Sequence, residues 1–181
     1  MATGFSQILE VSKYQILKSY LTRDLLILKS PAFQVDFNEL DSRFNINRKE
    51  DRYKLGMEQE NLLMVYQPKF GYLPEQRKGK ETGNWEDNQK LGDLIYHDIL
   101  IDLKISDINN SGLVGSITKS SIDNFVRDGY YLCISHDLCK RLFIPHRAIK
   151  LALDQNILTY YDNKYIRGTD LERVFNDECQ V

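Results

Sequence analysis

The chain has 181 residues, a length that fits one compact domain with a hydrophobic core of its own. Hydrophobic residues make up 42% of it and charged residues 28%, a balance that excludes extensive disorder. The formal net charge of -2 neither indicates nor excludes a nucleic-acid-binding protein, because acidic residues elsewhere can offset a local basic face.

The sequence carries no pattern of export or membrane insertion. The N-terminus lacks a basic segment followed by an apolar one, and no apolar run approaches the roughly 20 residues that cross a bilayer. The three cysteines, Cys133, Cys139 and Cys179, are an odd number without the spacing of a disulfide framework. We therefore expect a cytoplasmic protein with free thiols.

The first third of the chain predicts helices. Apolar residues recur at helical spacing over residues 5–28, and Pro31 ends this segment because proline cannot extend a helix. Residues 36–66 are expected to be helical in pieces, with Gly56 as the break. The polar stretch 67–90 is rich in proline and glycine and predicts a long connection of the kind that often serves a function.

The middle of the chain predicts β-structure. Residues 91–106 form two short apolar strands joined at Tyr96-His97-Asp98, and residues 130–135 form another buried strand. Between them, residues 118–126 predict a helix capped by Thr118 or Ser116.

The last part predicts a helix, a hairpin and a helix. Pro145 begins a helix that ends at Asp154, and residues 157–166 predict a hairpin that turns at Asp162-Asn163. A short helix over residues 170–175 is followed by a tail expected to be loose.

This order of elements predicts an α/β fold in which helices flank a mixed β-sheet. We expect one domain over residues 1–181, with three parts. These are a mainly helical part (1–66), a central part that carries the chemistry (91–135) and a C-terminal helix-hairpin-helix element (145–175).

Two carboxylates and a lysine in the central part suit metal-dependent phosphodiester hydrolysis. Asp102 and Lys104 are two residues apart on one strand, so their side chains lie on the same face, and Asp93 on the preceding strand can meet them across the hairpin. Two carboxylates can hold a divalent metal ion, and an ammonium group can orient the attacking water and offset negative charge at the phosphate.

The spacing of an aspartate, a second acidic residue and a lysine is common by chance. The apolar strand around Asp102 and Lys104 distinguishes this match from a chance one. A second match, Asp154 with Asp162 and Lys164, combines a helix end with a turn and does not converge on a sheet face. Asp102, by contrast, interrupts an apolar strand, where an isolated charge is costly without a partner or a metal. A plain surface ion pair between Asp102 and Lys104 is the alternative.

Gly92-Asp93, eight intervening residues, and then Ile101-Asp102-Leu103-Lys104-Ile105-Ser106 resemble the signature of the PD-(D/E)xK nucleases, and most of all that of small type II restriction endonucleases. The resemblance covers about residues 91–135. It implies a restriction-endonuclease-like fold, a Mg²⁺ cofactor, a homodimer, and cleavage of double-stranded DNA to 5′-phosphate ends. It makes Asp93 and Asp102 metal ligands and Lys104 the water-orienting cation. Glycine replaces the family's proline before Asp93.

Further residues are candidates for the same function. Many relatives place a glutamate on a helix before the hairpin, and Glu58 or Glu60 is available for this role. A helical glutamate is more often simply solvated. DNA contacts are expected from two groups of polar and basic residues, each of which is equally explained as ordinary loop and cap chemistry. They are Arg77, Lys78 and Lys80 in the long connection, and Asn109, Asn110, Ser116, Thr118 and Lys119 after the second strand.

Three alternatives remain beside this prediction. A structure-specific nuclease, such as a junction resolvase or a repair enzyme, would use the same three residues. A DNA-binding or interaction module without catalysis would use none of them. A zinc site at Cys133, His136 and Cys139 lacks a fourth ligand and a CxxC pair, and is disfavoured.

Overall fold

A central β-sheet between two groups of helices defines the architecture of the protein in the computed structural model, which describes residues 4–83 and 89–181. The helices are α1 (Gly4–Leu9), α2 (Ser12–Asp24), α3 (Pro31–Ser42), α4 (Lys49–Tyr66), α5 (Pro74–Thr82), α7 (Lys119–Asn124), α8 (His146–Asp154) and α9 (Gly168–Cys179), with the 3-10 helices η1 (Leu25–Lys29) and η2 (Ile108–Asn110). The strands are β1 (Phe70–Gly71), β2 (Leu94–Tyr96), β3 (Ile99–Ile105), β4 (Ile117–Thr118), β5 (Tyr130–Ile134), β6 (Arg141–Pro145) and β7 (Tyr165–Ile166).

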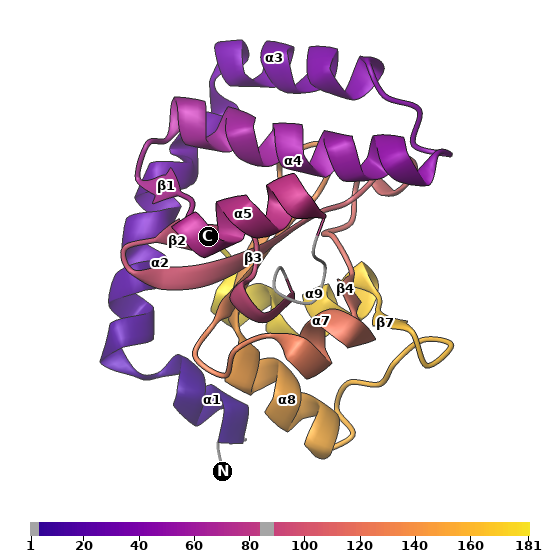
Figure 1. The fold of residues 1–181 in the computed structure, drawn as a ribbon. Coiled ribbons are helices and arrows are strands. Elements are labelled where there is room, and N and C mark those ends of the chain that lie inside the picture. Colours follow the sequence, from indigo (N-terminus) through magenta and orange to yellow (C-terminus); the bar gives the residue numbers. More distant parts are fainter. Residues whose placement is uncertain (1–3, 84–88) are drawn as a thin grey trace.

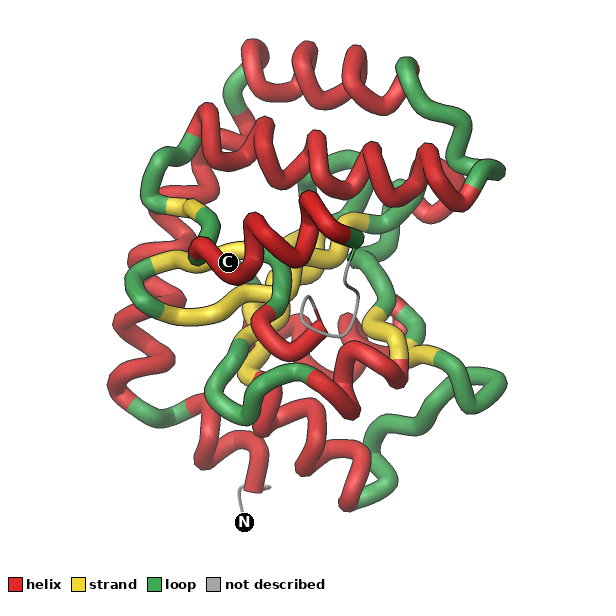
Figure 2. The backbone as a smooth tube through the Cα atoms, viewed as in Figure 1, coloured by secondary structure: helices red, strands yellow, loops and turns green. Residues whose placement is uncertain are grey.

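Among the described residues, the main sheet has five strands in the order β1-β2-β3-β5-β6, and β4 pairs with β7 in a separate ribbon. Strands β3 and β5 are parallel, whereas the other neighbours are antiparallel. In Figure 1, α3, α4 and α5 lie above the sheet and α7, α8 and α9 below it. Figure 2 shows the strands enclosed between these helical groups. The expected mixed sheet flanked by helices is confirmed.

The β2–β3 hairpin forms where the sequence predicts it. His97 and Asp98 form its two-residue turn, with φ values of 46° and 61°. Positive φ at both central positions twists the turn in the sense that suits a tight hairpin. The two strands then pair with Leu94 opposite Ile101, which fixes the register of every other pair in the hairpin.

The N-terminal helices differ from the expectation in two places. The segment 5–28 is divided into α1, α2 and η1, with Val11 in an extended conformation at the first break. Helix α4 runs through Gly56 without a break. A glycine costs about 1 kcal/mol in a helix interior, and burial of Leu55 and Leu63 on the same helix contributes more than that.

The polar stretch 67–90 is not the long loop that was expected. Within its described residues it contains β1 and the nine-residue helix α5. Pro74 occupies the first turn of α5, and Gly83 ends it in the left-handed conformation with a φ of 67°. This arrangement of proline and glycine is a sequence signal for a helix, and the abundance of polar residues concealed it.

The C-terminal part is more ordered than the sequence suggests. Strand β6 was not predicted, and Pro145 is its last residue rather than the first residue of α8. The turn at Asp162-Asn163 is present, with φ values of 51° and 52°. Tyr165 forms an antiparallel bridge with Tyr161 across this turn, so the tip of the expected hairpin is present, and strand β7 then pairs with β4.

The expectation of a loose tail is wrong. Helix α9 extends to Cys179, and both Cys179 and Val181 are buried. The Val181 N–H donates to the Arg141 carbonyl over 3.1 Å, and the Arg141 Nε donates to the Val181 carbonyl over 2.9 Å. The last residues therefore pair with the edge of β6, a contact that no local pattern reveals.

No helix formed by residues 4–83 and 89–181 combines the length and the apolar character that a bilayer crossing requires.

Gly115 holds the segment after η2 against β3. A Cβ atom at this position would lie 2.5 Å from the Lys104 carbonyl oxygen, whereas one at Gly112 would meet nothing within 4 Å. We expect Gly115→Ala to destabilise the protein by about 2 kcal/mol, and so to lower its thermal midpoint by about 4–8 °C. The matched control, Gly112→Ala, should change the midpoint little. Circular dichroism melts measure both, and equal midpoints would contradict the close approach.

Candidate active site

Asp93, Asp102 and Lys104 meet on one face of the β2–β3 hairpin. The strand register places Asp93 opposite Asp102, because Leu94 pairs with Ile101. The carboxyl groups of Asp93 and Asp102 share a hydrogen bond, and the Lys104 Nζ lies 2.8 Å from the Asp102 Oδ1. The convergence that the two-residue spacing predicts is therefore present.

The backbone fixes Asp93 in this position. Its N–H donates to the Ile101 carbonyl over 2.8 Å, and its Oδ2 accepts from the Leu103 N–H over 2.9 Å. Gly92, just before it, has a φ of 67°, and a Cβ there would lie 2.7 Å from the Ile101 carbonyl oxygen. Proline is restricted to φ near −65°, so the glycine follows from the backbone of this chain.

Two residues from different helices complete the cluster. Lys80 of α5 places its Nζ 2.6 Å from the Glu60 Oε2 and 3.4 Å from the Asp93 Oδ1. Glu60 belongs to α4, and its carboxylate also accepts from the Tyr72 hydroxyl over 3.0 Å. An ammonium group thus links the helical glutamate to the acidic pair on the sheet.

The protonation of these groups follows from their burial and their neighbours. Burial and the charge of Asp93 raise the pKa of Asp102 to about 7 and that of Glu60 to about 8, against the opposing effect of the lysines. Burial would also raise the pKa of Asp93, but Lys104 and Lys80 outweigh it and hold that pKa below its ordinary value. Burial would lower the pKa of Lys104, yet Asp102 and Asp93 raise it. Lys104 is therefore cationic at neutral pH.

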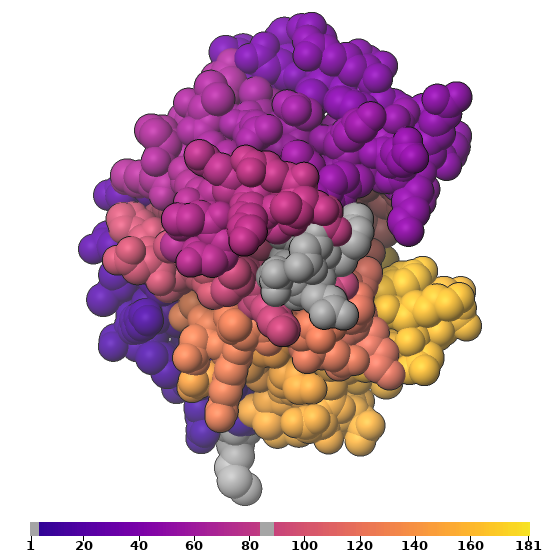
Figure 3. Space-filling view, viewed as in Figure 1, coloured from indigo at the N-terminus to yellow at the C-terminus, as the bar shows by residue number. Residues whose placement is uncertain are grey.

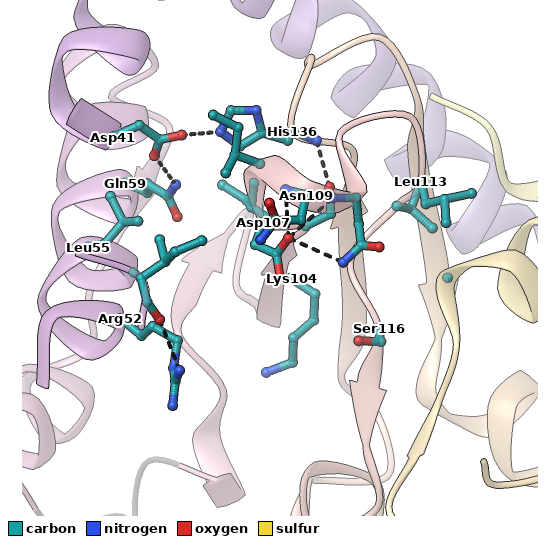
Figure 4. Close-up of a pocket in the computed structure, with 18 of the residues that line it drawn as sticks. Asp41, Arg52, Leu55, Gln59, Lys104, Asp107, Asn109, Leu113, Ser116 and His136 are labelled. Atoms are coloured by element: carbon teal, nitrogen blue, oxygen red, sulfur yellow. Dashed lines mark hydrogen bonds and ion pairs between the residues drawn. The ribbon is translucent and has the colours of Figure 1, made fainter. Parts of the chain in front are cut away.

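A cleft of about 1100 Å³ opens beside this cluster. Its walls are α3 and α4 on one side, and the segment 106–116 with residues 165–169 on the other. Figure 3 shows the hollow between the purple helical layer and the yellow C-terminal part. Lys104 and Glu60 belong to its wall, and Figure 4 shows the Lys104 side chain extending into it. Lys104 and Glu60 therefore border an open space, whereas Asp93 and Asp102 lie behind them and do not line it.

Glu60, rather than Glu58, is the helical glutamate that faces the candidate site. Glu58 is exposed and lines a separate shallow depression with Asp36 and Arg43. The two glutamates are two residues apart, which turns their side chains to nearly opposite sides of a helix. Of the two glutamates proposed from the sequence, the packing of α4 on the sheet selects Glu60 and excludes Glu58.

The three basic residues of α5 that were candidates for DNA contact differ in their exposure to solvent. Arg77 and Lys78 are exposed on a helix, not in a loop as expected. Only 7% of the Lys80 side chain is exposed, and its ammonium is directed at two carboxylates. The proposed contact between Lys80 and DNA phosphate is therefore corrected, because this group lies inside the acidic cluster.

The segment after β3 contributes partly to the cleft. Asn109, Asn110 and Ser116 line it. The Thr118 hydroxyl caps α7 by accepting from the Ser121 N–H over 3.3 Å. Lys119 donates to the Asn163 Oδ1 over 3.1 Å, outside the cleft wall. Asn109, Asn110 and Ser116 therefore belong to the cleft wall, where the Asn110 amide donates to Asp107 over 3.2 Å, whereas Thr118 and Lys119 make local contacts outside it.

Cys133, from the zinc alternative, lies next to this cluster, because it is the register partner of Lys104 on the neighbouring strand. Cys133 is buried on β5, and His136 pairs with Asp41 on α3. Across residues 4–83 and 89–181, no group of three or more His, Cys, Asp or Glu side chains has metal-binding spacing. Lys164 of the second sequence match pairs with its neighbour Asp162 at the surface.

The sequence did not point to Arg52, Arg167, Asp41 or Gln59 as cleft residues, and it named His136 only in the zinc alternative. Arg52 and Arg167 stand on opposite walls, and the His136–Asp41 pair lies on the wall next to α3, with Gln59 donating to Asp41 over 3.2 Å. Asp41 and His136 are 95 residues apart in the chain. No local pattern could have joined them.

Comparisons with protein-family models, with curated proteins and with solved structures find no match for this chain.

Proposed function

We propose that this protein is a Mg²⁺-dependent DNA endonuclease that uses Asp93, Asp102 and Lys104. The observation that carries the proposal is the contact of two carboxyl groups with each other, and of Asp102 with the half-buried Lys104 ammonium, beside a cleft. The resemblance of these residues to the PD-(D/E)xK signature supports the same function, and the central mixed sheet is compatible with a restriction-endonuclease-like fold.

The donor set fits a magnesium ion. Mg²⁺ prefers oxygen ligands and is typically held by one or two carboxylates, with water and substrate phosphate completing its shell. Asp93 and Asp102 supply the two carboxylates. Two carboxylates in contact repel each other when both are ionised, and a cation bound between them would relieve that repulsion. The raised pKa of Asp102 reflects this repulsion together with burial.

Each side chain has a distinct role in the proposed reaction. When bound, Mg²⁺ would polarise the scissile phosphate and lower the pKa of a bound water. Asp93 and Asp102 would hold the ion on the strand face that also carries Lys104. Lys104 keeps its proton, so it acts as a hydrogen-bond donor that orients the nucleophile and offsets the developing negative charge.

The cleft has the chemistry of a nucleic-acid site. Arg52 and Arg167 on opposite walls can contact phosphates, and Asn109 and Asn110 carry amides that can hydrogen-bond to bases. Cleavage of both strands of a symmetric duplex requires two such centres, and a twofold homodimer supplies them. We therefore propose double-stranded DNA as the substrate and a type II restriction enzyme as the biological form.

The decisive experiment incubates the purified protein with supercoiled plasmid and phage DNA, with Mg²⁺ or with EDTA. We expect discrete fragments with 5′-phosphate ends in Mg²⁺ only, and sequencing of the ends should identify one short recognition site. Ends that follow branches or flaps instead would identify a structure-specific nuclease. DNA binding without cleavage under any divalent metal would contradict the proposal and identify a binding module.

A further inference from the structure

We propose that the Lys80 ammonium group fills a second cation position, between Glu60 and Asp93, and thereby makes this a one-metal centre. The inference rests on the proposed function, because it concerns the number of metal ions at the same centre. Lys80 is then a positioning residue that acts through the two carboxylates. Glu60 is then a carboxylate that could bind a metal ion at the second cation position if Lys80 were absent.

The position of Lys80 is defined by contacts to both carboxylates. Its Nζ lies 2.6 Å from Glu60 and 3.4 Å from Asp93, and it stands over the Tyr72 ring at 5.5 Å. The Lys80 and Glu60 side chains are 7% and 8% exposed, so solvent cations have little access to this position. A buried ammonium with these partners is held firmly, since leaving either carboxylate unpaired is costly.

The start of α5 ties Lys80 to the sheet. The Gln76 side chain is fully buried, accepts from the Leu73 N–H over 2.8 Å and donates to the Leu91 carbonyl over 2.9 Å. Leu91 lies two residues before Asp93 in the chain. This bridge sets the helix that carries Lys80 beside the segment that carries Asp93.

Asp93 is the residue that the two halves of the cluster share. One half is Asp102 with Lys104, and the other is Glu60 with Lys80. Two-metal centres place their ions about 3.5–4 Å apart with ligands shared between them. Here an ammonium group already stands in the second half. With all side chains ionised, three carboxylates face two lysines, a net charge of −1 that one divalent ion changes to +1 and a second would raise to +3.

The test counts bound Mn²⁺ on the full-length protein without DNA, by electron paramagnetic resonance of the free ion at mildly alkaline pH. Wild type should bind one ion per chain, and Lys80→Ala should bind two, because Glu60 and Asp93 become free to act as ligands. Lys80→Arg, which keeps the positive charge, should bind one. Lys80→Ala combined with Glu60→Gln should return to one.

Each result separates this inference from the proposed function. Two ions in the wild type, or one in Lys80→Ala, would overturn the role of Lys80. No ion in the wild type would count against the proposed metal centre itself. Lys80→Ser provides the same comparison should Lys80→Ala not fold, and circular dichroism establishes folding before the titration.

Discussion

Lys104→Met should lower the rate of Mg²⁺-dependent DNA cleavage by about 10³-fold, within the 10²–10⁴ range for loss of one catalytic hydrogen-bond donor or proton-transfer group. The replacement keeps the length of the side chain and removes the charge that lies 2.8 Å from Asp102. DNA binding, measured by gel shift in Ca²⁺, should change by less than about tenfold, because one cation among many phosphate contacts is lost.

Two variants control this result. Lys150→Met removes an exposed lysine on α8 and should cleave at the wild-type rate. Lys104→Arg keeps a cation with a different shape, so it should recover part of the activity. Wild-type cleavage by Lys104→Met would show that the ammonium group takes no part in the reaction.

Asp102→Asn should abolish cleavage and yet stabilise the protein in the absence of metal. The amide keeps the shape of the side chain, can donate to Asp93 and removes one of the two carboxylates proposed to hold the metal. Activity should fall by about 10³-fold or more, because both metal affinity and charge placement are lost. Mn²⁺ titration should detect weakened binding in parallel.

The stability effect has a defined pH dependence. The pKa of Asp102 rises from an ordinary value of 3.8 to about 7, mainly through burial. Between these two pH values, the Asp102 carboxyl is therefore protonated in the folded state and ionised in the unfolded state. Metal-free wild type should therefore lose stability as pH rises from about 4 to about 7. Glu60 extends the loss to about pH 8, whereas the lowered pKa of Asp93 favours the folded state at all these pH values.

Asp102→Asn removes the Asp102 part of this loss. Its thermal midpoint should exceed that of wild type by at least about 2–4 °C at pH 8, a difference that corresponds to about 1 kcal/mol, and should approach it near pH 4. The exposed control Asp123→Asn should show no such divergence. Saturating Mg²⁺ should raise the wild-type midpoint at pH 8 more than at pH 5, because the metal binds the ionised carboxylates. A midpoint difference independent of pH would contradict a raised pKa at Asp102.

The centre of the candidate site could be predicted because its geometry is local. Side chains two residues apart on a strand lie on one face, which places Lys104 beside Asp102. A two-residue turn fixes the register of the hairpin, which places Asp93 opposite Asp102. The strands themselves were recognisable from short apolar runs. These relations need no knowledge of the rest of the chain.

The surroundings of that centre were decided by tertiary packing. Whether Glu58 or Glu60 faces the site depends on which side of α4 packs toward the sheet. Lys80 was expected in a polar loop, but α5 carries it into contact with Glu60 and Asp93. Strand β6 and the buried tail were also missed, since they stabilise each other across 40 residues of sequence through Arg141 and Val181.

The sequence by itself thus determined the hairpin, its register and the three side chains at its end, because neighbouring residues on a strand have a fixed spacing. Only the tertiary structure decided which distant charges neutralise them. Burial makes an unpaired charge costly, so the helices settle where Lys80, Glu60 and Asp93 satisfy one another. That mutual pairing depends on the packing of α4 and α5 against the sheet, and no short pattern in the chain encodes it.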